Sequence, residues 1–340
     1  MTDRVAVLGA GLIGTSIALS LSDLGWETVG WDPDSAVVAS LRALGSFDVL
    51  ADTAATATAG ADLVVLAGPP SSVPSLLGEL KTAALVTDVA GVKAGIPPAG
   101  QRLDHFVSSH PMAGREVSGP AAASPSLFRG AVWILITDGA ADEDLDRLEA
   151  IVTSVGSNPV RMTAAEHDDA VAVISHLPQV LAAALVGEAA EHPAGIGLAS
   201  GSFRDLTRVA ASNPALWTEL LVGNGGPLST VLEAYADRLH RWAAAVRDGN
   251  ADDVARTLHR AGAIRREMAP PAVAVAVALA DQPGELAKVG HALENSKVDV
   301  RDLQLRHATY GGGGILTLSV RPGEAETLRS ALEAEGLLLV

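Results

Sequence analysis

The chain has 340 residues, of which 48% are hydrophobic, so it is long enough for two or three domains with sizeable cores. Its formal net charge of −16 argues against nucleic acid and membrane surfaces as partners, because both are anionic. The absence of cysteine excludes disulfides, thiolate metal ligands and thiol nucleophiles.

The N-terminal stretch does not have the pattern of a signal peptide. Asp3 occupies the region that is normally positive, and glycines interrupt the apolar run that follows. The longest later apolar run, Ala272–Ala280, falls short of the roughly 20 residues that a membrane-spanning helix needs. We therefore expect a cytoplasmic protein.

The first part of the chain alternates short apolar runs with helix-like segments. Continuous apolar strands between helices are typical of a parallel sheet that helices cover on both faces. We therefore predict an α/β fold with a doubly wound, Rossmann-type domain over residues 1–162. The strand candidates are Arg4–Leu8, Thr28–Trp31, Leu63–Ala67, Leu85–Thr87, Phe106–Ser108 and Val132–Ile136.

Residues 163–268 are predicted to be all-helical. Thr163 and Glu166 form a capping-box pattern, which opens a long helix to about His192 that Pro178 should kink. These helices carry more apolar residues than one buried face needs, which favours a bundle or a dimer interface. Further helices are expected over about 205–222, 227–248 and 251–268.

The last part of the chain begins after a linker signal, Ala269-Pro270-Pro271. Residues 272–340 show strand and helix patterns in the order βαββαβ, with a turn at Gly311–Gly314. This order predicts a third domain, an α+β sandwich of the split βαβ type.

A glycine-rich motif follows the first strand candidate and opens a helix. Such glycines permit a tight turn, the close approach of a pyrophosphate and the packing of the helix on the strand. Asp32 ends the second strand candidate, where a carboxylate binds the adenosine ribose hydroxyls and repels a 2′-phosphate. The pattern therefore predicts NAD rather than NADP. The candidates in the motif are Gly9, Gly11, Leu12, Ile13 and Gly14.

Three further loops follow strand candidates, and ligands of open α/β sheets bind outside the carboxyl ends of the strands. These loops hold Gly68 and Pro69, the segment Asp88–Lys93, and His110. Pro111 pushes the backbone of His110 towards an extended conformation. Because imidazole titrates near neutral pH, His110 can accept a hydroxyl proton as hydride leaves to NAD. The structural alternative is a buried histidine bonded to a loop carbonyl.

Polar residues also cluster on the predicted helices. His167 and His176 are not spaced as a metal pair, and we predict no metal site. We interpret Asp168 as a partner of the helix dipole. Arg208, in apolar surroundings, either pairs with Asp205 or clamps a substrate carboxylate. The helical site candidates are Ser175, His176, Gln179 and Arg208.

Four motifs stand in order along the chain. They are Gly9–Gly14, His110-Pro111-Met112-Ala113-Gly114, Ser175-His176-Leu177-Pro178 and Phe203-Arg204-Asp205-Leu206-Thr207-Arg208. This combination resembles the prephenate dehydrogenase family, and the resemblance covers the whole chain. It implies a homodimer that uses NAD to oxidise prephenate to 4-hydroxyphenylpyruvate in tyrosine biosynthesis. It also implies that His110 polarises the substrate hydroxyl and that Arg208 binds a substrate carboxylate.

Two positions depart from the family pattern. Gly91 stands where the family commonly has a serine that bonds the histidine and the substrate hydroxyl. Either a water or a neighbouring hydroxyl such as Ser109 replaces this serine, or the substrate differs at C4. Gln179 stands where the family often has a histidine. Its neutral amide can bond a keto acid and offers no charge to the ammonium of arogenate, which favours prephenate.

The C-terminal 70 or so residues resemble an ACT domain, with Asp281–Leu286 at the first strand-to-helix turn. The resemblance implies feedback by tyrosine, or dimerisation; an inert structural appendage is the alternative.

Other functions fit the same residues. The substrate could be arogenate or a 4-amino-4-deoxy analogue of prephenate, and a 3-hydroxyacid-type dehydrogenase is a more distant possibility. Outside the enzymes, the chain could be an NAD-binding amino-acid sensor without catalysis.

Overall fold

The computed structural model describes residues 2–114, 117–199, 201–268, 272–307 and 313–340. The predicted linker 269–271 and part of the predicted turn at 311–314 lie outside the described residues. The chain divides into two compact units, Met1–Asp237 and Arg238–Val340. Their boundary falls within helix α12 (Gly225–Arg247), whereas the predicted domain limits, 1–162, 163–268 and 272–340, stay predictions.

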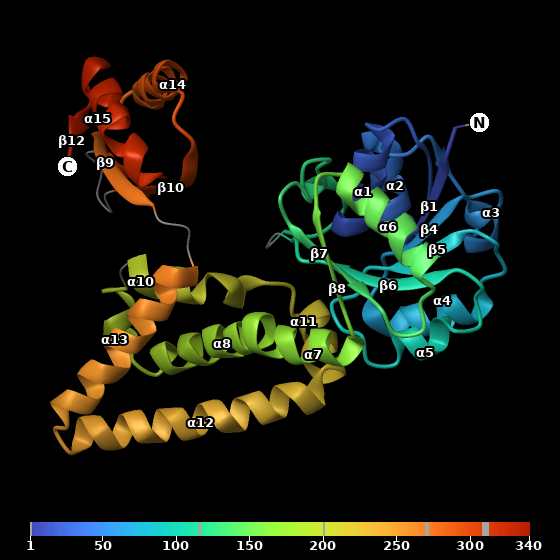
Figure 1. Cartoon of the computed structure of the whole chain (residues 1–340), viewed down its shortest axis with the longest axis horizontal. Coiled ribbons are helices and arrows are strands. Elements are labelled where there is room, and N and C mark those ends of the chain that lie inside the picture. The colour runs from blue at the N-terminus through green and yellow to red at the C-terminus, as the bar shows by residue number, and fades with distance from the viewer. Residues whose placement is uncertain (1, 115–116, 200, 269–271, 308–312) are drawn as a thin grey trace. The chain divides into compact units, whose positions relative to one another are not determined.

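An eight-stranded sheet forms the centre of the first unit (Figure 1). Its order is β3-β2-β1-β4-β5-β6-β7-β8, and the chain reverses its direction of winding between β3 and β4. This is the doubly wound topology, so the predicted Rossmann-type fold is confirmed. The strands are β1 (Arg4–Leu8), β2 (Glu27–Trp31), β3 (Val49–Leu50), β4 (Leu63–Leu66), β5 (Leu85–Asp88), β6 (Phe106–Pro111), β7 (Val132–Ile136) and β8 (Asn158–Met162).

Strand β6 joins the parallel strands β1 to β5 to the pair β7 and β8, which run parallel to each other and antiparallel to β6. Its first half pairs in parallel with β5, and its second half pairs with β7 in the antiparallel sense. The expectation of a purely parallel sheet is therefore wrong at β7. Pairing with β7 also extends β6 beyond Ser108, so that His110 lies in the strand opposite Ile134, and not in a loop after it as predicted.

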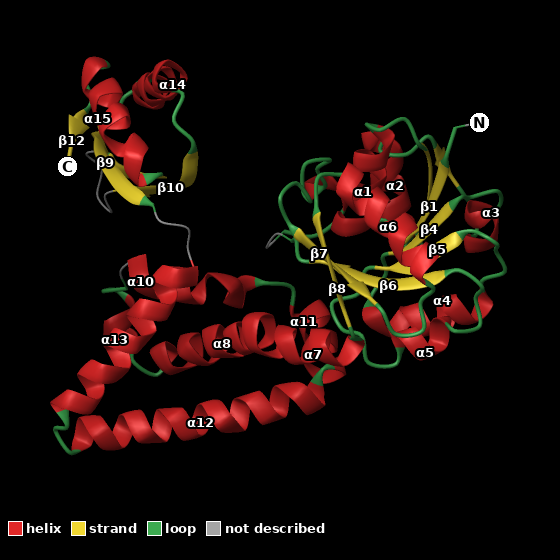
Figure 2. Cartoon of the chain, in the orientation of Figure 1, coloured by secondary structure: helices red, strands yellow, loops and turns green. Residues whose placement is uncertain are grey.

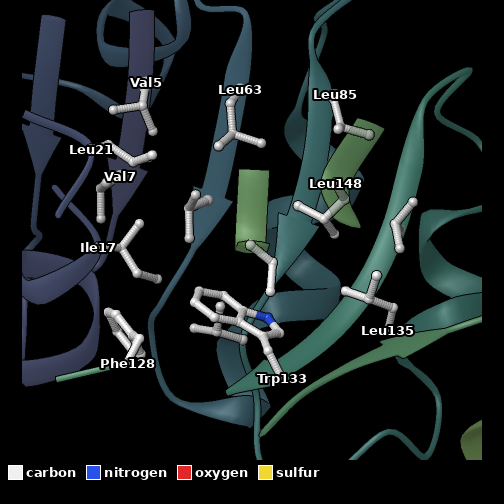
Figure 3. Close-up of a cluster of buried hydrophobic side chains, with 14 of the residues drawn as sticks. Val5, Val7, Ile17, Leu21, Leu63, Leu85, Phe128, Trp133, Leu135 and Leu148 are labelled. Atoms are coloured by element: carbon white, nitrogen blue, oxygen red, sulfur yellow. The ribbon is translucent and has the colours of Figure 1, made fainter. Parts of the chain in front are cut away.

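Two apolar clusters hold helices to the two faces of the sheet. On one face, α1 (Leu12–Ser22) and α6 (Asp142–Ser154) pack over the cluster drawn in Figure 3. On the other face, α4 (Val73–Glu79) and α5 (Ile96–Gly100) pack over a second cluster. Successive β1 residues belong to different clusters because strand side chains alternate between faces. The other helices of this part of the chain are α2 (Ser35–Leu44) and α3 (Ala54–Thr58).

A long bent helix follows β8. It consists of α7 (Ala164–Val171), the π-helical turn η3 (Ala172–His176) and α8 (Leu177–Ala190). The capping box is confirmed, since Thr163 Oγ1 accepts the N–H of Glu166 at 3.2 Å and Glu166 accepts that of Thr163 at 2.8 Å. The π turn ends just before α8, and Pro178 lies in the first turn of α8, where its missing N–H has no partner to lose. The predicted kink at Pro178 stays a prediction.

The remaining helices of the middle region are drawn in Figure 2. The predicted continuous helix over 205–222 is wrong, because the chain leaves the helix after Ala211. Asn213 then caps a new helix by accepting the N–H of Ala215 at 3.0 Å. The elements are α9 (Pro193–Ile196), α10 (Gly201–Thr207), η4 (Arg208–Ala211), α11 (Pro214–Gly223), α12 and, in the second unit, α13 (Ala251–Met268).

One helical stretch, Ala164–Ala190, is long and apolar enough to cross a membrane by length and composition. About a third of its most apolar window, 33%, is buried inside the structure. Its buried side chains include His167, Asp168 and His176, which bond to the sheet region and to α11. The stretch is therefore a helix of the folded domain, and its buried polar residues form hydrogen bonds inside that domain.

The second unit contains a four-stranded antiparallel sheet of order β10-β11-β9-β12. Alternate residues of its strands are buried with α14 and α15 in one cluster, so both helices cover one face. The predicted βαββαβ order is confirmed. Its elements are β9 (Val273–Leu279), α14 (Glu285–Ser296), β10 (Val300–His307), β11 (Gly314–Val320), α15 (Ala325–Ala334) and β12 (Leu338–Leu339).

Candidate active site

The turn between β1 and α1 has the geometry that its glycines predict. Gly9 has a φ of +99°, and a Cβ there would lie 2.5 Å from Gly68 N. A Cβ on Gly14 would lie 2.1 Å from Gly9 O. The start of α1 can therefore pack this closely against the turn only because residue 14 is a glycine. A Cβ on Gly11 would meet nothing within 4 Å, which leaves the helix N-terminus open to an anion.

Asp32 lies against this turn, directly after β2. Its Oδ2 accepts the N–H of Ala10 at 2.8 Å and its Oδ1 accepts that of Asp34 at 2.9 Å. Each oxygen keeps a further lone pair for a ribose hydroxyl. Leu12 and Ile13 form the first turn of α1, and Pro69 follows Gly68 after β4. The residues present therefore fit a bound dinucleotide.

Ser109 and His110 are neighbours on β6 and therefore point to opposite faces of the sheet. The Ser109 hydroxyl is buried, donates to the carbonyl of Asp88 at 2.8 Å and accepts the indole N–H of Trp133 at 3.0 Å. It also lies 2.9 Å from the Thr87 hydroxyl. The suggestion that Ser109 replaces the serine absent at position 91 is therefore wrong.

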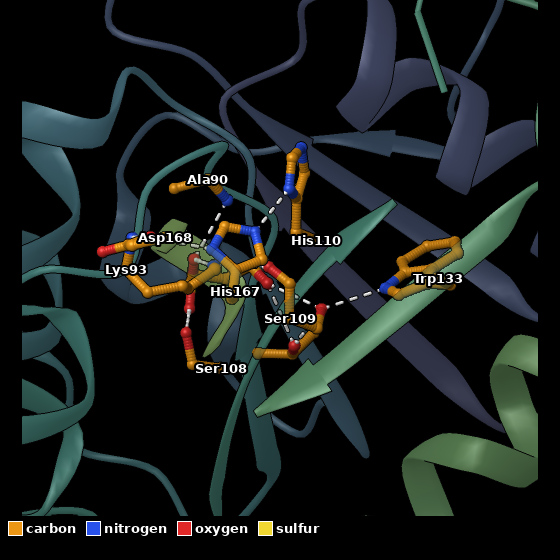
Figure 4. A network of polar contacts seen from close by, with 10 residues as sticks. Ala90, Lys93, Ser108, Ser109, His110, Trp133, His167 and Asp168 are labelled. Atoms are coloured by element: carbon orange, nitrogen blue, oxygen red, sulfur yellow. Dashed lines mark hydrogen bonds and ion pairs between the residues drawn. The ribbon is translucent and has the colours of Figure 1, made fainter. Parts of the chain in front are cut away.

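His110 ends a chain of polar contacts that continues into α7 (Figure 4). Its Nδ1 lies 2.8 Å from Nε2 of His167, and Nδ1 of His167 lies 2.8 Å from Oδ1 of Asp168. The same oxygen accepts the backbone N–H of Lys93 at 2.9 Å. His167 is fully buried, while His110 is partly exposed. The exposed end of this contact chain is thus the imidazole of His110, and its buried end is the carboxylate of Asp168.

A buried ion pair lies behind His110. Lys93 Nζ is 2.6 Å from Asp88 Oδ1 and donates to the carbonyl of Ser109 at 2.5 Å. The Ser108 hydroxyl donates to the other oxygen of Asp88 at 2.5 Å. This pair therefore ties the end of β5, the following loop and the peptide bond before His110 into one rigid arrangement.

The surroundings hold His110 in its neutral form. Burial lowers the pKa of His110 well below its ordinary value of 6.5, and its neighbours Lys93, His167 and His176 lower it further. Burial also lowers the pKa of His176. A neutral imidazole at the edge of the site can act as a proton acceptor at neutral pH.

Gly91 lies beside the outward nitrogen of His110. A Cβ at this position would stand 3.6 Å from His110 Nε2 and 2.9 Å from Leu220 Cδ2. The loop after β5 therefore borders the imidazole, as the sequence predicted. The structure adds that Leu220 of α11 packs against this loop at Gly91.

His176 is buried where α8 meets α11. Its Nδ1 lies 3.1 Å from Asn224 Nδ2, which also donates to the carbonyl of Asp168 at 2.7 Å. Its ring stands edge-on to Trp217, with centroids 6.2 Å apart. Ser175 precedes it, half-buried in the π turn. His176 thus joins α11 to the segment that carries His167 and Asp168.

Gln179 lies one turn beyond His176 on α8. Its Nε2 donates to the carbonyl of Val209 at 3.0 Å, and its buried Oε1 has no hydrogen-bond partner among the residues that the structure describes. Arg208, the residue before Val209, begins η4 and is exposed. The structure therefore brings the chain at Arg208 to the α8 face that carries His176 and Gln179.

Sequence reasoning missed the roles of four residues here: Lys93, His167, Asp168 and Asn224. Asp168 was assigned to the helix dipole, whereas its side chain bonds His167 and Lys93. The available signal was a His-Asp pair near the start of α7, the helix that follows the last strand of the eight-stranded sheet. Among the described residues, no group of three or more His, Asp or Glu side chains is arranged to hold a metal ion.

A dinucleotide-binding turn and a neutral histidine at the same edge of the sheet define a nicotinamide-dependent dehydrogenase. The comparisons with known proteins agree. Residues 17–161 match the model of the prephenate dehydrogenase nucleotide-binding domain, and residues 163–260 match that of the prephenate dehydrogenase dimerization domain.

Similar proteins extend over most of the chain. A prephenate dehydrogenase of Bacillus subtilis is 30% identical over 94% of this chain and 92% of its own length. A cyclohexadienyl dehydrogenase of Zymomonas mobilis is 31% identical over 73% of this chain and 90% of its own length. The solved structure of Synechocystis arogenate dehydrogenase is 29% identical, with a TM-score of 0.68, over 78% of this chain and 100% of that chain.

This chain belongs to the prephenate dehydrogenase family. The predicted family and the predicted enzyme class, an NAD-dependent dehydrogenase, are thereby confirmed.

Proposed function

We propose that this chain is an NAD-dependent prephenate dehydrogenase, which oxidises and decarboxylates prephenate to 4-hydroxyphenylpyruvate for tyrosine biosynthesis. The observation that carries the proposal is the position of His110, whose outward nitrogen faces the Gly91 loop at the edge of the dinucleotide-binding sheet. The fold and the family support the same activity.

Each residue of the candidate site has its own role in this reaction. Bound NAD would supply the acceptor for the hydride of C4, held by the turn at Gly9–Gly14 and by Asp32. His110 Nε2 accepts the proton of the C4 hydroxyl, and loss of the ring carboxylate as CO2 makes the product aromatic. Arg208 binds a substrate carboxylate, because a dianion needs a local cation in a chain of net charge −16. Ser175, His176, Gln179 and Gly91 line the substrate side.

The orientation of Gln179 makes arogenate a second candidate substrate. The carbonyl of Val209 can only accept, so it must face the amide nitrogen of Gln179 and leave Oε1 free. A buried free acceptor suits a donor such as the ammonium of arogenate better than the keto group of prephenate. The sequence favours prephenate because the amide of Gln179 is neutral, but it does not show how that amide is oriented.

One assay separates these possibilities. Purified full-length protein is mixed with NAD and, in turn, with prephenate, arogenate, the 4-amino-4-deoxy analogue and a simple 3-hydroxyacid, and NADH is followed by absorbance. We expect the highest kcat/KM with prephenate. Turnover of arogenate alone would reassign the substrate, and tight NAD binding without any turnover would favour the amino-acid sensor.

We also propose that the protein is a cytoplasmic homodimer joined through its helical region. The matched family model is that of a dimerization domain, and α8 and its preceding turn leave large apolar side chains exposed. They are Val173, Ile174, Leu185 and Val186. Sedimentation should show a dimer for the native chain and a monomer for Leu185→Glu, whereas Leu44→Glu on α2 should stay dimeric.

Tyrosine is the proposed effector of the C-terminal domain. Support comes from the predicted βαββαβ order, which the structure of residues 273–339 has and which resembles an ACT domain. We expect tyrosine to inhibit the full-length protein and not a chain that ends at Met268. Equal inhibition of both would place the effector site elsewhere.

A further inference from the structure

We propose that His167 and Asp168 hold the proton of His110 on Nδ1 and then receive the charge that His110 acquires during the reaction. They are positioning residues, since they act through His110. The identity of the reacting hydroxyl rests on the proposed function, whereas the assignment of the resting proton positions does not.

One group in contact with Asp168 can only donate a hydrogen bond. The backbone N–H of Lys93 points at Oδ1 of Asp168 from 2.9 Å, so this oxygen is an acceptor. His167 Nδ1 faces the same oxygen at 2.8 Å and must therefore carry a proton. Asp168 thus fixes the tautomer of His167, because a neutral imidazole protonated on Nδ1 has a lone pair on Nε2.

The proton position on His110 follows in the same way from that on His167. The lone pair of His167 Nε2 faces His110 Nδ1 at 2.8 Å, so the proton between them belongs to His110. With Nδ1 protonated, the neutral ring of His110 presents a lone pair on Nε2. That nitrogen is the one near Gly91, on the open side of the contact chain. The tautomer set from Asp168 is therefore the one that can accept a proton from substrate.

The contact chain also gives the accepted proton a route. As the substrate O–H bond breaks, an N–H bond forms at His110 Nε2 while the hydride leaves to NAD. The His110 Nδ1–H bond can then break as an N–H bond forms at His167 Nε2. The positive charge ends on His167 next to the carboxylate of Asp168, and His110 is neutral again.

Charged and titratable neighbours act on both histidine rings. Lys93 and His176 disfavour a positive charge on the ring of His110, and His176 also repels a positive charge on His167. The ammonium of Lys93 is itself paired with Asp88 at 2.6 Å. Asp168 is the carboxylate in direct contact with the two-histidine chain, so it is the group that stabilises the imidazolium.

The resting proton positions can be measured without turnover. In 15N NMR spectra of the full-length protein with labelled histidine, protonated and unprotonated ring nitrogens give well-separated shifts. The chain has 9 histidines, and comparison with His110→Gln assigns the signals of residue 110. We expect Nδ1 of His110 to be protonated and Nε2 to be unprotonated at neutral pH. A proton on Nε2 in the native protein would overturn the proposal.

The variant Asp168→Asn should keep the contact chain and remove its charge. The N–H of Lys93 and Nδ1 of His167 both face Oδ1 of Asp168, so an amide oxygen at that place can accept from both and keep the tautomers of His167 and His110. The negative charge that stabilises the imidazolium is lost. We expect kcat to fall by a factor on the order of 10²–10³, with little change in the KM for substrate, while the NMR signals still show His110 protonated on Nδ1.

Asp169→Asn is the matched control, because Asp169 is the next residue on the same helix and is exposed. It should leave kcat and the spectrum unchanged. A folded Asp168→Asn protein with kcat within about twofold of the native value would refute the proposal. If that variant does not fold, the spectrum of the native protein still decides. Absence of turnover with every substrate would count against the proposed function and not against the tautomer.

Discussion

Lys93 and Asp88 form an ion pair of 2.6 Å in which both side chains are fully buried. Removing one partner of such a pair leaves an uncompensated charge in the interior, which costs more than the pair itself contributes. The pair also lies directly behind the peptide bond of His110. Its integrity therefore matters for the stability of the sheet and for the position of the base.

We predict that Lys93→Met lowers the free energy of unfolding by about 3–5 kcal/mol, because Asp88 is left unpaired. Urea unfolding followed by tryptophan fluorescence measures the change. The double variant Asp88→Asn/Lys93→Met should recover part of the loss. Lys81→Met, which replaces an exposed lysine, should change stability by no more than about 0.5 kcal/mol. Equal losses at positions 81 and 93 would contradict the prediction.

The pH dependence of kcat/KM should show the lowered pKa of His110. The neutral ring is the base, and its pKa lies well below 6.5, so activity should persist as the pH falls through 6.5. We expect the acid limb of the profile to have its midpoint well below that value. A midpoint at or above 6.5 would mean that another group, or a solvated histidine, accepts the proton.

Gly91 offers a way to test the neighbourhood of the base. We predict that Gly91→Ser raises kcat/KM for prephenate about 2–10-fold, the effect of one added hydrogen bond near His110 Nε2. The added Cβ approaches Leu220 Cδ2 at 2.9 Å, the end of a flexible side chain that can move. Gly91→Ala adds the same Cβ without a hydroxyl and should bring no gain. Equal kinetics of the two variants would rule out a role for the hydroxyl.

Asp32 should set the choice of cofactor. Asp32→Asn keeps an acceptor for the N–H of Ala10 and removes the negative charge that would repel a 2′-phosphate. We expect the ratio of kcat/KM with NAD to that with NADP to fall at least about 10-fold. Thermal unfolding without cofactor serves as the control for the turn. An unchanged ratio would show that other groups discriminate between the cofactors.

Much of the fold follows from local sequence patterns. The glycine spacing at Gly9–Gly14 defines its own turn, because Gly9 has a φ of +99° and a Cβ on Gly14 would lie 2.1 Å from Gly9 O. The capping box at Thr163 likewise needs only residues three positions apart. The apolar runs of six strands were found because both faces of the sheet are buried. The strands β3 and β8 were missed because one has two residues and the other is mostly exposed.

The candidate active site depends on contacts between residues that are far apart in the chain, and no local sequence pattern contains these contacts. The sequence by itself determined that a histidine stands at the end of a strand beside a dinucleotide turn. Only the tertiary structure decided that β7 extends this strand, that Ser109 faces the interior, and that His110 meets His167 and Asp168 from α7. The physical reason is that caps, turns and strand periodicity involve near neighbours in the chain, whereas proton positions depend on which distant groups pack against the ring.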